Sequence, residues 1–316
     1  MMEGTRTPSL DCRRNLLVAR VGDRSLHRTW LSESGDRSWD LQLSSYGSSS
    51  AFKADGDLPF SIDRGTKWDS IFRHLSTNPE LLERYDYIAF PDDDLSFEPR
   101  SLNRLFNTCR EFDLYIAQPG LTRRSYYSHP ITLRCPPFRL RYTNYVEGMA
   151  PCFKASYLKN ILPELAGWYS GWGIARAWAL RMKNPVRRAA IIDEAPMTHT
   201  RPLLSGTIYK DLEQLNIDPQ QELERIRAYY DGIPWMMTTY GGQMPRGAPC
   251  GGFRARTVNG LYLMALAPLL KTRKFALLSG MRMIVRAFTQ SGYQPVQLMR
   301  KMNRCGSVRE ASLAVR

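Results

Sequence analysis

The sequence has few cysteines, no long apolar run and no apolar segment at its N-terminus. Its six cysteines, among 316 residues, include no C-x-x-C pair, which argues against a disulfide framework or a structural zinc site. The longest clean apolar stretch, 261–270, has ten residues and contains Pro268, whereas a bilayer-spanning helix needs about twenty. Residues 1–15 lack the apolar core of a secretory signal. We therefore expect a reduced, cytoplasmic protein without a membrane-spanning helix.

Acidic residues are scarce in the last 72 positions. Residues 245–316 contain thirteen Lys or Arg and a single acid, Glu310, whereas the first 244 residues carry 31 bases and 29 acids. The formal charge of +14 is therefore concentrated at the C-terminal end. With 43% hydrophobic and 11% aromatic residues, the composition is that of a globular protein. We interpret the chain as a near-neutral body followed by a basic tail.

The basic tail also carries an apolar pattern with helical spacing. The pattern consists of Leu277, Met281, Ile284 and Phe288. This spacing predicts an amphipathic helix, and Lys274, Arg282 and Arg286 fall on a neighbouring face of it. Such a helix either lies in the headgroup plane of an anionic membrane or packs its stripe on the body and leaves its cations in water. No nucleic-acid-binding motif accompanies the charge, so we expect no specific nucleic-acid partner.

The body alternates between strand-like and helix-like segments. Apolar or alternating runs predict strands, and 67–83 and 99–112 have helical character, the former in two stretches. The predicted strands are 15–21, 39–43, 85–90, 114–117 and 189–192. This alternation predicts a mainly parallel sheet with helices on both faces. In such α/β folds, ligands bind beyond the carboxyl ends of the strands.

Three adjacent acids, Asp92, Asp93 and Asp94, directly follow the strand that ends at Phe90. Adjacent carboxylates repel one another, so water or a cation must screen them. Two carboxylates spaced Asp-x-Asp can hold a divalent ion that bridges a substrate diphosphate. A solvated turn, or a cluster favouring the start of the following helix, explains the same triplet without a ligand.

A histidine lies a few residues beyond another predicted strand. His199 follows the segment 189–192, whose carboxyl end belongs at the same sheet edge as the acids. A borderline metal such as Mn²⁺ accepts imidazole together with carboxylates. The alternative is a hydrogen-bonded loop histidine with no ligand.

Several ordered segments together resemble a glycosyltransferase-like domain-of-unknown-function family, number seven-zero-seven. They are GTKWD at 65–69, YDYIAFPDDDL at 85–95, SHPIT at 128–132, LRYTNYVEGMAP at 140–151, SGWG at 170–173 and MTHTRP at 197–202. The wider resemblance is to nucleotide-diphospho-sugar glycosyltransferases of the A-type fold, whose Asp-x-Asp motif holds the metal and the donor. The segments span roughly residues 15 to 205.

This resemblance implies a single Rossmann-like A-type domain and divides the chain accordingly. Residues 1–14 become a flexible N-terminus, 15–205 the glycosyltransferase-like domain, 206–244 a helical linker and 245–316 the basic amphipathic tail. The implied activity is transfer of a sugar from a nucleotide-sugar donor to a glycan or lipid-linked acceptor, as in surface polysaccharide synthesis. If the tail binds lipid rather than packing on the body, it would attach the enzyme to the cytoplasmic face of a membrane. Fold alone does not fix an activity.

The resemblance assigns the donor end of the site to the acidic triplet. Mn²⁺ or Mg²⁺ held by Asp92, Asp94 and His199 would neutralise the charge of the departing diphosphate. Lys67 would reach the same diphosphate as a point charge, although a surface lysine at a helix start is the alternative. Asp93 would contact the ribose or the donor sugar, unless it is merely solvated.

The residue that activates the acceptor is less clear from the resemblance. Relatives carry an acid two residues after Gly173, but this chain has Ala175 there. Glu147 is the first choice for this role, with a structural pair to Arg141 as the alternative, and Asp193 is the second. Otherwise the mechanism retains configuration and needs no such base, or the protein is a catalytically impaired glycan- or nucleotide-binding relative.

Aromatic residues around a glycine pair complete the expected site. Trp168 and Trp172, close to Gly173, would stack on a sugar, although aromatic residues in such a place more often belong to the core. His129 would lie near the pocket, or be a buried histidine bonded to backbone. Two other functions remain open: a metal-dependent nucleotidyl or phosphoryl enzyme, and a membrane adaptor in which the tail is the active part.

Overall fold

The computed structural model describes residues 13–32, 37–203, 212–213 and 215–301, and within them the predicted strands and helices are confirmed. The strands are β1 (Asn15–Val21), β2 (Trp39–Ser45), β4 (Tyr87–Ala89), β6 (Ile116–Leu121) and β9 (Ala189–His199). The helices are α2 (Lys67–Thr77), α3 (Leu81–Arg84) and α4 (Ser101–Glu111). His199 is the last residue of β9 rather than a loop residue beyond it.

These strands all run in one direction. β1 pairs in parallel with β2 and β4, β2 pairs in parallel with β3 (Ser61–Ile62), and β6 pairs in parallel with β9. β8 (Cys152–Lys154) lies between β4 and β6 and is antiparallel to both, so β4 and β6 point the same way. The carboxyl ends of β1, β4, β6 and β9 therefore meet at one edge of the sheet.

The complete sheet is mixed, which corrects the expectation of a mainly parallel one. Its order is β11-β10-β7-β9-β6-β8-β4-β1-β2-β3, with β5 paired to β9. Among the described residues, six of the ten strand pairings are antiparallel. The strands that sequence reading missed are short: β3, β5 (Leu95–Phe97), β7 (Leu140–Thr143), β8, β10 (Thr239–Gln243) and β11 (Pro249–Gly251). None of them has the longer apolar run that reveals β1 or β6.

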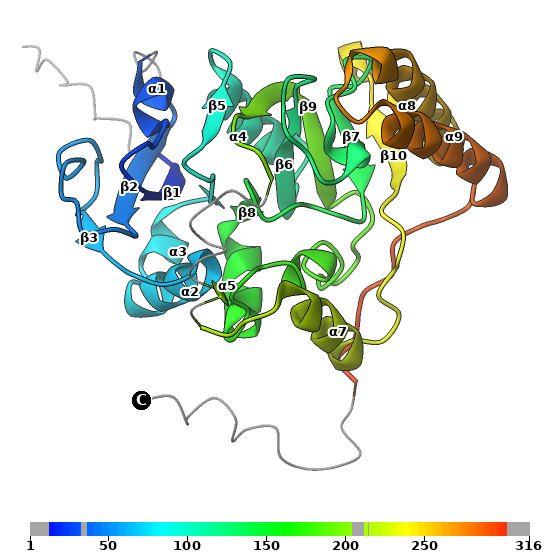
Figure 1. Cartoon of the computed structure of the whole chain (residues 1–316). Coiled ribbons are helices and arrows are strands. Elements are labelled where there is room, and N and C mark those ends of the chain that lie inside the picture. The colour runs from blue at the N-terminus through cyan, green and yellow to red at the C-terminus, as the bar shows by residue number, and fades with distance from the viewer. Residues whose placement is uncertain (1–12, 33–36, 204–211, 214, 302–316) are drawn as a thin grey trace, which may run out of the picture.

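Helices cover both faces of the sheet, as the alternating pattern predicts (Figure 1). In β1, Leu16 and Val18 face one hydrophobic cluster, while Leu17 and Val21 face another, which explains why the whole strand is apolar. The first cluster includes side chains of α2, α3 and α5 (Ala155–Leu165), and the second includes side chains of α1 (His27–Leu31) and α4.

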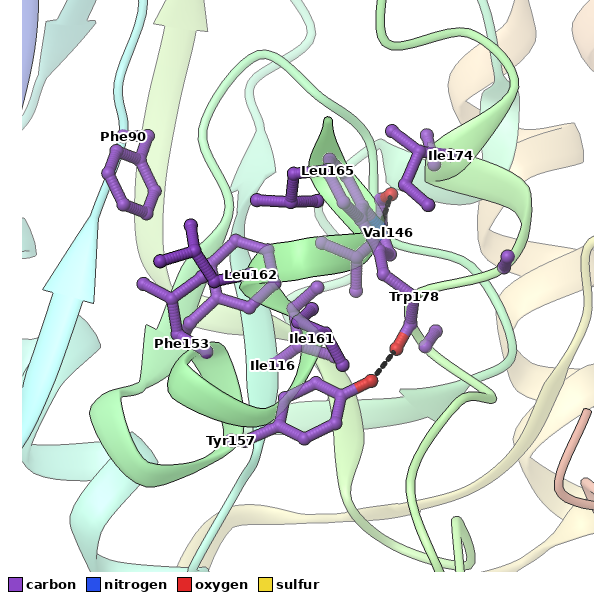
Figure 2. Close-up of a cluster of buried hydrophobic side chains, with 14 of the residues drawn as sticks. Phe90, Ile116, Val146, Phe153, Tyr157, Ile161, Leu162, Leu165, Ile174 and Trp178 are labelled. Atoms are coloured by element: carbon purple, nitrogen blue, oxygen red, sulfur yellow. Dashed lines mark hydrogen bonds between the residues drawn. The ribbon is translucent and has the colours of Figure 1, made fainter. Parts of the chain in front are cut away.

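The first cluster fixes the segment that follows β7. The indole of Trp178 donates to the carbonyl oxygen of Val146 at 2.8 Å and packs edge-to-face on Phe153, with ring centroids 5.4 Å apart. Tyr157, a residue of α5, donates a hydrogen bond from its hydroxyl to the carbonyl oxygen of Trp178 (Figure 2). Val146 and its neighbours are thereby held against the core, and the residue that follows, Glu147, is presented from a rigid base.

The C-terminal third contains strands as well as the predicted helices. The expected helical linker contains α7 (Pro219–Tyr229) but also β10, and β11 then opens the expected tail, so both strands extend the sheet. The tail continues as two helices, α8 (Gly252–Leu266) and α9 (Arg273–Thr289). None of the helices in the described ranges combines the length and the apolarity needed to cross a bilayer. The predicted flexible N-terminus lies outside the described residues, apart from its last two positions.

Candidate active site

A cleft of about 480 Å³ opens at the sheet edge where the parallel strands end. Its walls come from the ends of β1, β4 and β9, from the start of α2, and from the loops around residues 128, 147 and 171. The residues predicted from the sequence that line it are Lys67, Asp92, Asp93, Asp94, His129, Glu147, Trp172 and His199. Asp92, Asp93, Asp94 and His199 therefore lie together at one edge of the sheet.

Lys67, the first residue of α2, holds Asp92 in place. Its ammonium group donates to Asp92 Oδ1 at 2.6 Å, to the carbonyl oxygen of Phe90 at 2.7 Å and to that of Gly148 at 2.9 Å. Its side chain is only 13% exposed, so it is not a surface lysine. The three donors of the ammonium group are occupied, and Lys67 joins the end of β4 to the segment before β8.

Asp92 has an elevated pKa although its side chain opens onto the cleft. Limited hydration between the cleft walls raises the pKa of Asp92 to about 6. The Lys67 charge opposes this rise, and the neighbouring Asp94 charge adds to it. A cation entering the cleft would favour the ionised form.

Asp93 ties several strand ends together. Its Oδ2 accepts hydrogen bonds from the backbone N–H of Gly22 at 2.8 Å and the hydroxyl of Tyr46 at 3.0 Å, and Arg201 lies 3.4 Å from its Oδ1. Burial raises the pKa of Asp93, against the opposing effects of Gly22 and Arg201. These contacts join the loops after β1, β2 and β9. Its contact with a ribose or sugar stays a prediction.

Asp94 and His199 form the closest acid–imidazole pair of the cleft. Asp94 Oδ2 lies 3.3 Å from His199 Nε2, and both side chains are largely buried. His199 Nδ1 lies 2.8 Å from the carbonyl oxygen of Tyr126, so Nδ1–H donates and Nε2 faces the acid. Burial alone would lower the pKa of His199, but Asp94 and this carbonyl outweigh it and raise the pKa to about 9.

The donor set fits a divalent cation in part. Asp94 Oδ1 is buried and has no hydrogen-bond partner among the described residues, and carboxylates with one anchored imidazole suit Mn²⁺ or Mg²⁺. However, the described residues contain no group of three or more His, Cys, Asp or Glu side chains arranged to hold a metal ion. The third predicted ligand, Asp92, is turned to Lys67 instead.

Glu147 presents an unpaired carboxylate to the same cleft. Its Oε2 is buried without a hydrogen-bond partner in the part of the chain that the structure describes. Burial raises the pKa of Glu147 to about 7, the nearby Asp92 charge adds to this, and His199 and Arg176 oppose it. The alternative of a structural pair with Arg141 is wrong, because Arg141 binds another acid. A carboxylate with a pKa near 7 is suited to general-base chemistry.

Asp193, the second candidate base, belongs to the interior rather than to the cleft. Both Asp193 and Arg141 are fully inaccessible, and the guanidinium donates to both carboxylate oxygens at 2.8 Å. Asp193 Oδ1 also accepts the backbone N–H of Cys135. The expectation of a catalytic Asp193 is therefore corrected, since no acceptor hydroxyl reaches it.

The aromatic platform is reduced to one of the two predicted tryptophans. Trp172 lines the cleft, whereas Trp168 is 4% exposed and packs in the core under Arg225, whose guanidinium carbon lies 4.0 Å from the ring centroid. Gly173 is also a packing residue, because a Cβ there would lie 2.6 Å from the carbonyl oxygen of Glu222. The roles predicted for Trp168 and Gly173 in substrate binding are thus corrected.

Trp68 and Gly171 are cleft residues that sequence reading did not assign. Gly171 has φ of 77°, and a Cβ there would lie 2.3 Å from the indole nitrogen of Trp68. Only glycine allows this turn to lie against the indole. The Gly-Trp-Gly sequence indicates a turn, but the positive φ of Gly171 and its contact with Trp68 become visible only in the folded structure.

His129 and Arg176 also line the cleft. The His129 ring packs edge-on against Tyr145, with centroids 5.1 Å apart, and burial together with the charge of Arg176 lowers the pKa of His129 to about 4. Arg176 also lies over the Tyr145 ring, at 5.4 Å. Ala175 lines the cleft as well, so the position where the family resemblance leads us to expect an acid does face the site. Arg176, Arg20 and Tyr46 are cleft residues without a sequence motif.

Residues 57–170, about a third of the chain, match the family model described as "Protein of unknown function (DUF707)", which confirms the resemblance over that segment. Among solved structures, TarS 1–349 of S. aureus, in complex with UDP-GlcNAc, is 8% identical with a TM-score of 0.42, covering 92% of this chain and 97% of that chain. A candidate nucleotide-diphospho-sugar transferase from Desulfovibrio desulfuricans G20 is 10% identical with a TM-score of 0.32, covering 50% of this chain and 70% of that chain. No curated protein sequence matches the chain. Trp172, Ala175 and His199 lie outside the matched segment.

Proposed function

We propose that this protein is a metal-dependent glycosyltransferase that moves a sugar from a nucleoside-diphosphate donor to a glycan or lipid-linked acceptor. The observation that carries the proposal is the pairing of two unsatisfied carboxylates in one cleft. Asp94 Oδ1 is buried and unpaired beside an oriented His199, and Glu147 Oε2 is buried and unpaired in the same cleft, both among the described residues. A cation would satisfy the carboxylate of Asp94, and a proton from an acceptor hydroxyl would satisfy that of Glu147.

The donor diphosphate belongs at the acidic turn. Asp94 and His199 are the residues that would hold Mn²⁺ or Mg²⁺, with Asp92 joining them once its carboxylate turns from Lys67, and such an ion would neutralise the charge of the departing diphosphate as a Lewis acid. The carbonyl oxygen of Tyr126 fixes the imidazole so that Nε2 faces Asp94. Lys67 holds the carboxylate of Asp92 at the cleft wall and adds a positive charge there.

Glu147 is the proposed general base. An acceptor hydroxyl oxygen forms a bond to the anomeric carbon while the bond from that carbon to the diphosphate oxygen breaks and its electron pair leaves with the diphosphate. The hydroxyl proton passes to Glu147 Oε2. Because the pKa of Glu147 is about 7, this carboxyl is ionised in a large share of molecules near neutral pH and still basic enough to accept the proton.

The remaining cleft residues would position the two sugars. Trp172 would offer an aromatic face to pyranose C–H groups, and the neutral imidazole of His129 would offer a hydrogen-bonding edge in the same cleft. Arg176 would neutralise anionic groups of a substrate, since it also lines the cleft.

A thermal-shift panel of uridine, guanosine and adenosine diphosphates, each with Mn²⁺ or with EDTA, tests the donor half of the proposal. Binding at one hundred times Kd stabilises the folded state by about 2.7 kcal/mol, which for a protein of this size raises Tm by on the order of 5 °C. We expect one nucleotide to give such a shift with Mn²⁺ and not with EDTA. Shifts that are identical in both conditions, or absent for all nucleotides, would refute the metal-dependent donor site.

Ala175 favours one alternative, a relative that binds nucleotide-sugars without transferring them. The alanine faces the cleft at the position where the family resemblance places an acid. Slow release of free sugar from the stabilising donor in the presence of Mn²⁺ would distinguish the two functions. Turnover that Glu147→Gln abolishes supports the transferase, whereas saturable binding without turnover identifies the binder.

A further inference from the structure

Helices α8 and α9 form a closely packed antiparallel pair, called here the hairpin, beyond β10 (Figure 1). A Cβ placed on Gly280 of α9 would lie 2.7 Å from the carbonyl oxygen of Gly260 in α8, so the two backbones touch where both residues lack a side chain. Ala276 and Ala287 of α9 are fully buried on the same side as Gly280. Small residues at i, i+4 and i+11 therefore form the packed face of α9, in place of the large apolar stripe.

One side of the hairpin is fastened to the body. Leu263, Leu266 and Ala276 join a hydrophobic cluster that also contains Leu95 and Met149. In the same region, the side-chain oxygen of Asn259 accepts a hydrogen bond from the buried guanidinium of Arg141 at 2.9 Å. The hairpin has a fixed orientation, and its opposite side points away from the protein.

That outer side is apolar across both helices. The rings of Phe253 on α8 and Phe288 on α9 meet edge-to-face with centroids 5.0 Å apart, which shows that both helices turn this side the same way. Exposed fractions reach 67% for Phe288, 54% for Leu261 and 49% for Met281. The exposed large apolar residues of the hairpin are Phe253, Leu261, Phe275, Leu277, Leu278, Met281, Val285 and Phe288. The predicted stripe is therefore exposed rather than packed on the body, apart from the partly buried Ile284.

Cations accompany this apolar face without any acid nearby in the sequence. Residues 245–301 contain ten Lys or Arg and no Asp or Glu. Arg254, Lys274 and Arg282 are exposed on the two helices. A group of eight exposed large apolar side chains on two adjacent helices is unusual on a monomer and indicates an interaction site. The neighbouring cations favour an anionic partner.

We propose that the outer face of the hairpin docks on the surface of an anionic lipid bilayer. The helices have 15 and 17 residues and are thus about 22 and 25 Å long, so they can lie along the headgroup plane with their apolar side chains inserted and their cations at the phosphates. A second copy of the chain is a poorer partner, because it would bring two acid-free cationic faces together. The docking does not depend on the proposed catalysis.

Sedimentation with vesicles tests this inference on the full chain. We expect binding to vesicles of phosphatidylglycerol and phosphatidylcholine, little binding to phosphatidylcholine alone, and release as salt rises, because screening weakens the lipid contact. Met281→Ser with Phe288→Ser should lower the partition coefficient at least about tenfold, and so should Lys274→Glu with Arg282→Glu. Val186→Ser, at an exposed apolar position of the body, is the matched control and should bind like the wild type.

Two further measurements guard against a misfolded variant or another partner. Phe288→Trp keeps an aromatic side chain, and its added fluorescence should shift to the blue on anionic vesicles. Absence of that shift, wild-type binding by both double variants, or no binding of the wild type would overturn the proposal. Sedimentation velocity showing a dimer that Met281→Ser with Phe288→Ser dissolves would also overturn it and assign the face to self-association.

Discussion

The buried ion pair between Asp193 and Arg141 makes Asp193→Asn the sharpest test of the fold around the site. The guanidinium donates twice to the carboxylate, and its other N–H groups bind the carbonyl oxygens of Ile131 and Leu133 and the side chain of Asn259. All five donors are used, and neither partner is exposed. Loss of the carboxylate charge therefore leaves a cation in the interior without compensation.

The expected loss of stability is large. Removing one partner of a buried pair costs about 3–5 kcal/mol, because the remaining charge stays out of water. The total stability of a folded protein is only about 5–15 kcal/mol, so the variant should lose a substantial part of it. Asp231→Asn, at a side chain that is 72% exposed, is the matched control and should change stability by less than about 0.5 kcal/mol.

Equilibrium urea denaturation followed by tryptophan fluorescence measures the difference. The midpoint should fall for Asp193→Asn while the slope of the transition stays unchanged, since the surface exposed on unfolding is the same. A wild-type midpoint combined with lost turnover would refute the structural role and return Asp193 to the list of candidate bases.

Three further predictions concern the cleft. The free energy of unfolding of the wild type without metal should fall as pH rises from about 4.5 through about 7, because the folded state retains the proton of Glu147 in this range. In urea titrations, Glu147→Gln should flatten this dependence. Identical pH profiles for the two proteins would contradict the raised pKa of Glu147. Asp94→Ala should abolish Mn²⁺-dependent nucleotide binding in calorimetry, with Asp231→Ala as the control; unchanged affinity counts against the metal site. Gly171→Ala should lower the free energy of unfolding by more than about 2 kcal/mol, through backbone strain and a clash with Trp68. Gly167→Ala is the control, because Gly167 also has positive φ but lies in open space, and it should lower the free energy by about 1 kcal/mol. Equal losses for the two variants would refute the clash.

The residues at the strand ends could be predicted from the sequence, because an α/β fold class implies parallel strands whose carboxyl ends share one edge of the sheet. The apolar run before Asp92 and the run that leads to His199 were read as strands of one α/β sheet, and their carboxyl ends do share an edge. Lys67 and Glu147 were found through the resemblance, and both face the cleft.

Position in the sequence does not tell which side of an element a side chain takes, and this accounts for the errors. Asp193 and Glu194 are adjacent in β9, yet Asp193 is buried against Arg141 while Glu194 binds the half-buried Arg139. Trp168 and Trp172 are four residues apart, and only one faces the cavity. The short antiparallel strands depend on pairing partners that lie far along the chain, so local patterns did not reveal them.

The hydrophobic cluster beneath the hairpin determines how a C-terminal truncation would affect this protein. The inner side of the hairpin shares this cluster with Leu95, next to Asp94, and with Met149. The carbonyl oxygen of Met149 accepts the backbone N–H of Asp92. Cutting the chain at 245 would thus strip the acidic turn of its support along with the tail, so loss of activity in such a deletion would say nothing about targeting. The hairpin and the acidic turn are thus parts of one packed unit.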